Sequence, residues 1–168
     1  MSDRPTDVAI EAAGGDDVTA LVDLWLDLAA DQRRHGSHLR TSENRPVIHE
    51  TMVRHVVADT ALLARRGDAV VGFVTFAVET GRYEQDRSRG VIHNVYVRPS
   101  DRDDGIGTAL LEAAEADLAS RGVDAVSLQA MARNEPARRF YSRRGYTAHR
   151  IELEKPINDG SEGTDGDA

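Results

Sequence analysis

A β-rich run, a proline and two closely spaced glycines follow one another near the middle of the chain. The run Val91–Val97 is typical of a strand, and Pro99 ends it because proline cannot donate to a strand ladder. Gly105 and Gly107 then open a helix predicted for Gly107–Arg121, in which apolar residues recur at spacings of three and four. A strand that passes directly into a helix in this way predicts an α/β fold.

The two glycines also predict an anion-binding loop. A helix N-terminus presents unpaired N–H groups and about half a unit of positive charge, and glycine lets a ligand approach that backbone closely. The loop fits neither common nucleotide pattern, because Leu110 replaces the third glycine of the dinucleotide fingerprint and no Lys-Ser/Thr pair follows as in a P-loop. Asp101, Asp103 and Asp104 lie in the same stretch. An anion fits there only if the backbone binds it and the carboxylates point elsewhere.

The remaining pattern predicts a mixed α/β sheet in one domain. Strands are predicted at Val8–Ala12, Ala61–Ala64, Ala69–Val78, Val91–Val97, Val123–Ala130 and Tyr146–Glu154. Helices are predicted from about Val18 to Ala29, at about Val47–Ala58, at Gly107–Arg121 and at Glu135–Arg144. Strict alternation places Val91, His93, Val95 and Val97 on one face of their strand and Ile92, Asn94 and Tyr96 on the other. Residues 1–157 are expected to form the domain, and the acidic, glycine-rich stretch 158–168 a disordered tail.

Composition disfavours several classes of function. The chain has 168 residues, no cysteine and a net charge of −8, which argues against a disulfide framework, a thiolate nucleophile and a nucleic-acid-binding surface. The six histidines form no metal-ligand pattern. No apolar run is long enough for a secretory leader or a membrane span. We therefore expect a cytoplasmic protein without a metal, a membrane contact or a nucleic-acid partner.

Two longer motifs resemble those of the GNAT superfamily of acetyl-CoA-dependent N-acetyltransferases. In the first, Arg102, Gly105 and Gly107 fit the family's pattern of a strand, a proline and Arg/Gln-x-x-Gly-x-Gly/Ala at the start of a helix. The second fits Asn-x-x-Ala-x-x-Phe/Leu-Tyr-x-x-x-Gly-Phe/Tyr, here with Asn134, Ala137, Phe140, Tyr141, Gly145 and Tyr146. The resemblance implies the GNAT fold, a mixed and mostly antiparallel sheet of six to seven strands. About four helices flank that sheet, which is splayed between its fourth and fifth strands.

The same resemblance implies where the cosubstrate acetyl-CoA binds. In the family, backbone N–H groups of the loop hold the coenzyme pyrophosphate. Here those groups belong to Asp103, Asp104, Gly105, Ile106, Gly107 and Thr108, with Arg102 beside them. The pantetheine arm pairs with the fourth strand, near Val95, Tyr96 and Val97. Asn134 is expected to hydrogen-bond that arm, and Arg138 to meet a coenzyme phosphate.

The implied reaction is direct attack by an amine on the acetyl thioester. It needs a base for the ammonium, an N–H donor for the carbonyl and an acid for the departing thiolate. Tyr141 stands at the family's tyrosine position and is the expected acid, because a phenol with a pKa of about 10 stays protonated at neutral pH. The alternative is that Tyr141 only packs beside Phe140 and has no catalytic role. Two residues are candidates for the base, His93 and Glu79. The backbone N–H of Val95 is the group expected to polarise the acetyl carbonyl.

The sequence does not name the acceptor amine. The loops Asp31–Pro46 and Thr80–Gly90 are expected to contact it, and their acidic side chains fit a cationic amine. Three hypotheses follow: transfer to a small-molecule amine, transfer to a protein or peptide N-terminus, and a catalytically silent acyl-CoA-binding or regulatory module. The family resemblance also suggests a homodimer.

Overall fold

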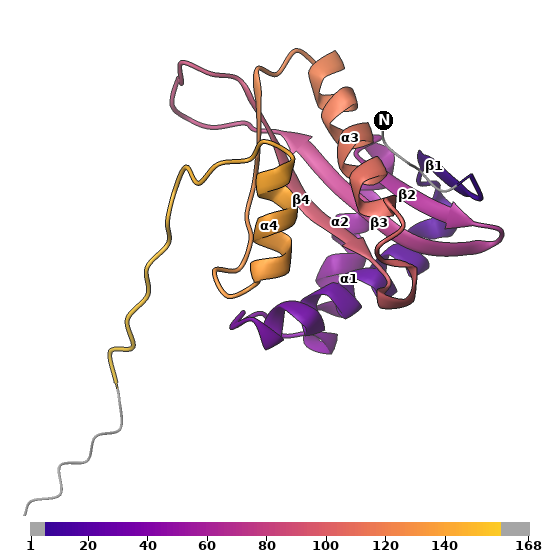
Figure 1. Ribbon diagram of the computed structural model, residues 1–168, viewed down its shortest axis with the longest axis horizontal. Helices are drawn as coiled ribbons and strands as arrows, with labels where there is room; N and C mark the ends of the chain where they lie inside the picture. The colour runs from indigo at the N-terminus through magenta and orange to yellow at the C-terminus, as the bar shows by residue number, and fades with distance from the viewer. Residues whose placement is uncertain (1–5, 159–168) are drawn as a thin grey trace, which may run out of the picture.

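One five-stranded mixed sheet organises the chain. The structure is a computed structural model that describes residues 6–158 (Figure 1). The sheet has the order β1-β2-β3-β4-β5, and its strands are β1 (Val8–Ala12), β2 (Ala61–Arg66), β3 (Ala69–Val78), β4 (Arg89–Val97) and β5 (Ala125–Leu128). Neighbouring strands are antiparallel except β4 and β5, which are parallel and are joined through a helix. The prediction of a mixed α/β sheet is confirmed.

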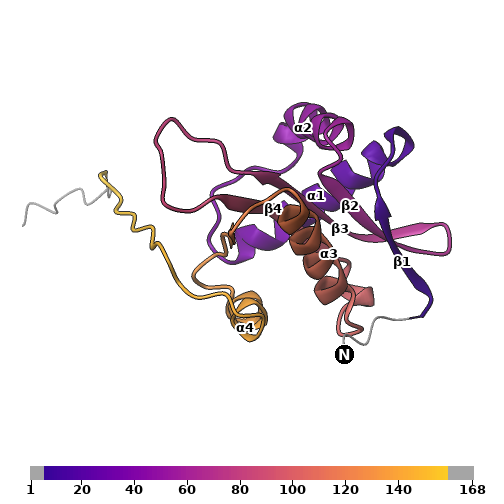
Figure 2. The ribbon, with the colours of Figure 1, turned by 90° about the horizontal axis from the view of Figure 1, so that it is seen from above.

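Helices cover both faces of this sheet (Figure 2). They are α1 (Val18–Arg34), α2 (Arg45–Val57), α3 (Ile106–Ser120) and α4 (Glu135–Arg143), with short 3₁₀ turns at Gly15–Asp17, Ser42–Asn44 and Pro99–Asp101. Helices α1 and α2 pack on one face, whereas α3 packs on the other and α4 lies beside α3. Within residues 6–158, none of the helices is long and apolar enough to cross a membrane.

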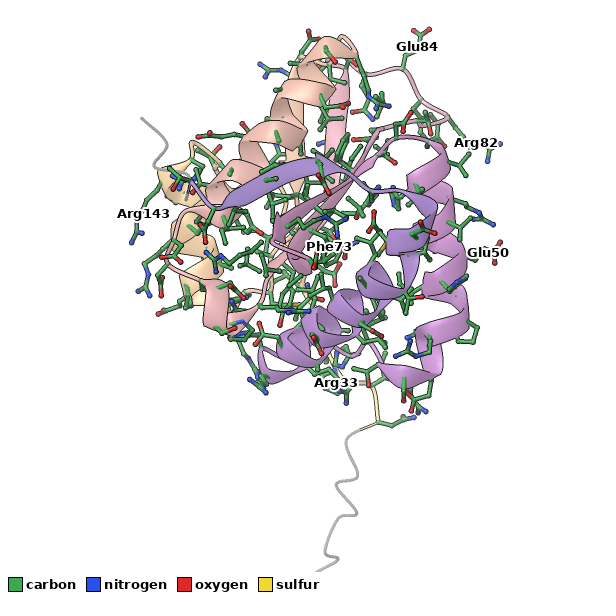
Figure 3. All side chains as sticks on the ribbon, turned by 90° about the vertical axis from the view of Figure 1, so that its right-hand side faces the viewer. Arg33, Glu50, Phe73, Arg82, Glu84 and Arg143 are labelled. Atoms are coloured by element: carbon green, nitrogen blue, oxygen red, sulfur yellow. The ribbon has the colours of Figure 1, made fainter. Side chains whose placement is uncertain are left out.

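Each face of the sheet has its own apolar core. On one face, Leu21 of α1 and Met52 of α2 pack in the same cluster as Phe73 of β3. On the other, Leu110 of α3 belongs to the cluster that contains Val74 of β3. Phe73 and Val74 are chain neighbours that enter opposite cores, as expected of a strand covered on both sides. Figure 3 shows Phe73 at the centre of the molecule.

The C-terminal part of the sheet differs from the prediction. The sheet has five strands rather than six to seven, because Tyr146–Glu154 pairs with no strand among residues 6–158. The strand predicted for Val123–Ala130 is shortened to Ala125–Leu128, since only these residues find partners on β4. Helix α1 runs on to Arg34 and takes up the start of the predicted loop. The tail predicted for 158–168 lies outside the described residues, apart from Asn158.

Gly72 of β3 generates a prediction about stability. A Cβ there would lie 2.8 Å from the Tyr96 carbonyl oxygen, which is backbone and cannot turn aside. Gly72→Ala is therefore expected to cost about 1–3 kcal/mol, seen as a Tm lower by several degrees. Gly15→Ala is the matched control, because a Cβ at Gly15 meets nothing within 4 Å. Thermal unfolding of both variants gives the comparison, and equal Tm values would contradict the packing argument.

Candidate active site

Part of one edge of β4 has no strand beside it. The parallel ladder between β4 and β5 begins at Arg89 and ends where Ile92 meets Leu128. β4 itself continues to Val97, so its edge from His93 to Val97 has no strand partner on that side within residues 6–158. An unpaired strand edge can bind an extended ligand through backbone hydrogen bonds.

The loop after β4 presents a row of free backbone donors. The N–H groups from Asp103 to Thr108 donate to no acceptor within residues 6–158. The first intrahelical bond that α3 makes is from Ala109 N to the Gly105 carbonyl, at 3.0 Å. Gly105 lies in the left-handed region with φ +79°, and Asp103 with φ +68° also turns the loop. Six consecutive N–H groups at a helix N-terminus form a ready anion site.

Arg66 neutralises the acidic side chains of this loop. Its guanidinium donates to Asp101, which is buried, and approaches Asp104 at 3.4 Å. It also pairs with Asp7 at 2.8 Å. Asp103 is exposed. Asp101 and Asp104 are thus paired with Arg66 of β2. Their negative charge therefore repels an anion at the loop backbone less than the sequence alone suggests.

Arg102 lies between the loop and the end of β4. Its Nε donates to the Val97 carbonyl oxygen at 2.8 Å, and its guanidinium stands 5.2 Å from the Tyr96 ring centroid. These contacts bring Arg102 together with Tyr96 and Val97, three residues that the sequence assigns to the coenzyme. The Val97 carbonyl is occupied by this arginine, so Val95 and Tyr96 offer the freer part of the edge.

Helix α4 is attached to the first turn of α3. The Arg144 guanidinium donates to the Thr108 hydroxyl and lies 4.8 Å from the centroid of the Phe140 ring. Phe140 in turn faces Gly107, where an added Cβ would lie 3.6 Å from Cζ. Asn134 caps α4, because its Oδ1 accepts from Ala137 N at 3.3 Å. Its side-chain NH₂ group donates to no acceptor within residues 6–158.

Arg138 is held near the start of the same helix. Its Nη1 donates to the Ala132 carbonyl oxygen at 3.1 Å, and the side chain is otherwise exposed. The structure thus brings the loop residues and the end of β4 together beside Phe140 and Arg144, whereas the hydrogen bonds of Asn134 and Arg138 stay at the start of α4.

Tyr141 lies half-buried on α4 between two other aromatic rings. Its ring centroid is 5.4 Å from that of Phe140 and 5.9 Å from that of Tyr146. Burial raises the pKa of the Tyr141 phenol to about 12. The phenol is therefore protonated over the whole neutral range, which is the state that a proton donor requires.

His93 is the extra residue of a β-bulge. Thr75 pairs with Asn94 and Phe76 with Ile92, so His93 has no residue opposite it on β3. The bulge overturns the predicted alternation, because it shifts the side chains on either side of it by one position. Asn94 fixes this register: its Nδ2 donates to the fully buried Thr75 hydroxyl at 2.8 Å.

His55 of α2 lies beside His93. The two ring centroids are 5.8 Å apart, and the His55 Nδ1 lies 2.7 Å from the buried Thr60 hydroxyl. Burial lowers the pKa of His93. Burial, and then the nearby His93, lower the pKa of His55. Both imidazoles are therefore neutral at neutral pH and available as proton acceptors.

Glu79, the other candidate base, is engaged elsewhere. Its carboxylate accepts from Arg89 Nε at 2.8 Å and Arg89 Nη2 at 3.0 Å, and Gln85 lies 3.3 Å away. The Arg89 hydrogen bond lowers the pKa of Glu79. A carboxylate held in this way is a weak proton acceptor, and it sits by Arg89 rather than at the bulge.

His93 and Tyr141 approach β4 from opposite faces. His93 stands beside α2, whereas Tyr141 belongs to the apolar cluster around α3. Figure 2 shows α2 and α4 on opposite sides of β4. A thioester lying along the open edge of β4 would therefore have an imidazole on one side and a phenol on the other. Residues 6–158 contain no group of three or more acidic or histidine side chains suited to a metal ion.

Three residues of this arrangement were not predicted: His55, Arg66 and Arg144. His55 precedes His93 by 38 positions and meets it only through the packing of α2 on the sheet. Arg66 stands in an ordinary turn sequence. Arg144 lies inside the second motif at a position that the motif leaves unspecified, so no local signal marks any of them.

Sequence comparison decides the family. The sequence model of the acetyltransferase (GNAT) family matches residues 18–146, which is most of the chain. The chain belongs to the GNAT acetyltransferase family.

Among curated relatives, a mycothiol acetyltransferase of Thermobispora bispora is 35% identical to this GNAT chain over 91 residues. That match covers 54% of this chain and 31% of the relative, so the chain spans less than a third of that protein. The relative's name therefore carries no substrate over to this chain.

Solved structures agree on the fold. A GCN5-related N-acetyltransferase from Ralstonia eutropha is 26% identical, with a TM-score of 0.71, over 89% of this chain and 98% of that one. A predicted acetyltransferase from Clostridium acetobutylicum, solved with acetyl-CoA, has a TM-score of 0.72 at 17% identity, over 89% of this chain and 96% of that one. The second likeness concerns the fold alone.

Gly105 gives a test of the loop geometry. Its φ of +79° disfavours any side chain, so Gly105→Ala is expected to cost about 1–2 kcal/mol and lower the Tm. Gly107→Ala is the matched control, since its Cβ would make only an ordinary 3.6 Å contact and alanine favours helix. Thermal unfolding without ligand compares the two. Greater loss of stability in Gly107→Ala would contradict the geometry described for the loop.

Proposed function

We propose that this protein transfers the acetyl group of acetyl-CoA directly to a primary amine. The observation that carries the proposal is the row of free N–H groups from Asp103 to Thr108, placed next to the open edge of β4. The N–H groups suit the pyrophosphate of coenzyme A, and the open edge of β4 suits its extended pantetheine arm. In the same proposal, residues up to about 157 act as one cytoplasmic acetyltransferase unit.

The coenzyme would lie across the ends of β4, α3 and α4. Its pyrophosphate takes the loop N–H groups, and its pantetheine arm pairs with Val95 and Tyr96, beyond the end of the β4–β5 ladder. Asn134 can donate its side-chain NH₂ group to that arm while Oδ1 still caps α4. The exposed Arg138 and Arg102 supply positive charge for the phosphates.

The chemical step needs no covalent enzyme intermediate. The amine nitrogen attacks the thioester carbonyl carbon, a C–N bond forms, and the C–S bond breaks as the oxyanion collapses. His93 takes the proton that the amine nitrogen loses, and Tyr141 gives its proton to the departing thiolate sulfur. The Val95 N–H stabilises the carbonyl oxygen while negative charge builds on it.

The acceptor side lies by α2 and the loop between β3 and β4. That loop lines a shallow polar cleft with Tyr83, Gln85 and Arg89. Glu84 and Asp86 of the same loop would attract a cationic amine toward this cleft by their charge. We therefore propose a small-molecule amine as the acceptor.

The deciding experiment is acetyl-CoA turnover against a panel of small amines and short peptides, followed by release of free coenzyme A. Turnover with small amines supports the proposal, and turnover with peptides alone would favour an N-terminal acetyltransferase. Coenzyme binding without release on any amine would indicate a silent binding module. With an active amine, Tyr141→Phe is expected to lower kcat by about 10²-fold with little change in KM. Full turnover by that variant would remove Tyr141 as the acid.

The pH dependence tests the choice of base. His93 must be neutral to accept a proton, and its pKa is lowered by burial, so kcat/KM is expected to rise with pH and reach half its maximum below pH 6.5. His93→Gln should remove this rise and lower the plateau. Glu79→Gln is the control and should keep the rise at the same pH. If Glu79→Gln removes the rise instead, Glu79 is the base.

A further inference from the structure

Two imidazoles meet between α2 and β4, and the proposed reaction uses only one of them. The ring centroids of His55 and His93 are 5.8 Å apart, and their planes are tilted by 55°. His93 is the more exposed of the two, and His55 is partly buried. Because the bulge leaves no residue of β3 opposite His93, its side chain is free to turn toward α2. A second imidazole, placed more deeply, thus stands behind the candidate base.

Thr60 holds one nitrogen of the inner ring. His55 Nδ1 lies 2.7 Å from the Thr60 hydroxyl, and Thr60 is buried. The backbone of Thr60 is fixed in turn, because its N–H donates to the His55 carbonyl at 2.9 Å and its carbonyl accepts from Phe76 N of β3 at 3.0 Å. A ring held at Nδ1 by such a partner keeps its orientation, and Nε2 is the nitrogen left for another partner.

The same contacts indicate that His55 Nε2 is an acceptor. The Thr60 hydroxyl proton has an acceptor of its own, the His55 carbonyl oxygen at 3.4 Å. The hydroxyl oxygen can then accept from Nδ1–H, and we assign the neutral ring with its proton on Nδ1 and a lone pair on Nε2. His55 stays neutral at neutral pH because burial, and then the charge of His93, lower its pKa. The inner imidazole therefore offers a lone pair while the outer one carries a proton.

The charged side chains nearby do not compete for the two rings. Glu50 and Arg54, the charged neighbours of His55 on α2, pair with each other on the exposed side of the helix, where Figure 3 shows Glu50 pointing outward. Within residues 6–158, the charge of His93 acts on His55, and no charge of another side chain acts on either ring. A proton on His93 thus has no carboxylate partner in this part of the chain, and His55 is the ring that it meets.

We infer that His55 is a positioning residue for His93: its Nε2 accepts, through one bridging water, from the His93 nitrogen that carries the proton. The 5.8 Å between the centroids is too long for a direct bond between the rings and suits one water between their nitrogens. The contact is strongest when His93 is charged, so it favours the imidazolium that forms as the amine gives its proton to His93. The inference rests on the proposed role of His93 as the base, but the pairing itself can be measured without an acceptor amine.

An NMR titration of the His93 ring tests the pairing in the ligand-free protein. His55→Phe keeps a ring but has no acceptor, so the pKa of His93 should fall by about 0.5–1 pH unit. His55→Gln keeps an acceptor near the Nε2 position and should leave the His93 pKa as in the wild type. His49→Phe, which changes an exposed histidine of the same helix, is the matched control and should have no effect. No fall in His55→Phe, or an equal fall in both His55 variants, would overturn the inference.

Thr60 gives a second test that leaves both imidazoles in place. Thr60→Val keeps the branched side chain but removes the hydroxyl that holds His55 Nδ1, so the pKa of His93 should again fall. Thr60→Ser keeps the hydroxyl and should titrate like the wild type. If Thr60→Val also titrates like the wild type, the anchored ring does not determine the environment of His93, and the inference is wrong.

The pH profile of turnover shows whether the pairing serves the reaction. With an amine that is acetylated, His55→Phe should lower kcat about tenfold, the effect of one hydrogen bond, and leave KM for acetyl-CoA unchanged. The rise in kcat/KM should move to lower pH in step with the NMR titration, and His55→Gln should restore the wild-type profile. If the NMR pKa falls but the kinetic profile does not move, His93 is not the base. That outcome overturns the proposed role of His93 and, with it, the part of His55 in the reaction, whereas an unchanged NMR pKa overturns the pairing alone.

Discussion

Six backbone N–H groups between β4 and α3 have no acceptor in the described chain, and much of the surrounding structure keeps them available. A helix must begin with unpaired donors, and the left-handed turn at Gly105 extends the row into the loop. Arg66 pairs with Asp101 and Asp104, so acidic side chains can coexist with an anion site. The loop backbone is therefore left open to an anion, while the side chains of Asp101, Asp104 and Arg102 attach the loop to the sheet.

His93, the extra residue of the β-bulge in β4, fixes the position of the candidate base. Without the bulge, His93 would sit opposite a residue of β3 within the ladder. With it, the imidazole stands beside His55, and the Asn94–Thr75 hydrogen bond holds the register. Two imidazoles 5.8 Å apart resist double protonation, because each charge opposes the other. Burial lowers the pKa of both rings as well, so both are neutral at neutral pH, which is the state that a proton acceptor requires.

Local patterns in the sequence predicted most of the fold and the glycine-containing loop before α3, because those features depend on residues close together in the chain. Pro99, Gly105 and the apolar stripe of α3 mark the loop without reference to anything distant. The bulge at His93 depends on its partner strand, and the contacts of His55 and Arg66 depend on how helices and hairpins pack. No short stretch of the sequence contains that information. Strict alternation therefore placed His93 on the wrong face of β4. The hydrogen bonds from Arg89 to Glu79 were likewise not predicted.

The missing sixth strand shows a different limit. Apolar residues at every second position indicate that a segment needs a sheet edge and an apolar surface. The pattern does not indicate which part of the structure provides them. Ile151 and Leu153 satisfy that pattern while remaining largely exposed, and among residues 6–158 β5 has no strand on its outer edge, beside partly buried aromatic side chains. Within residues 6–158, the exposed segment does not pair with the open edge of β5. A period of two therefore predicts what a segment needs, whereas whether that need is met depends on how distant elements pack.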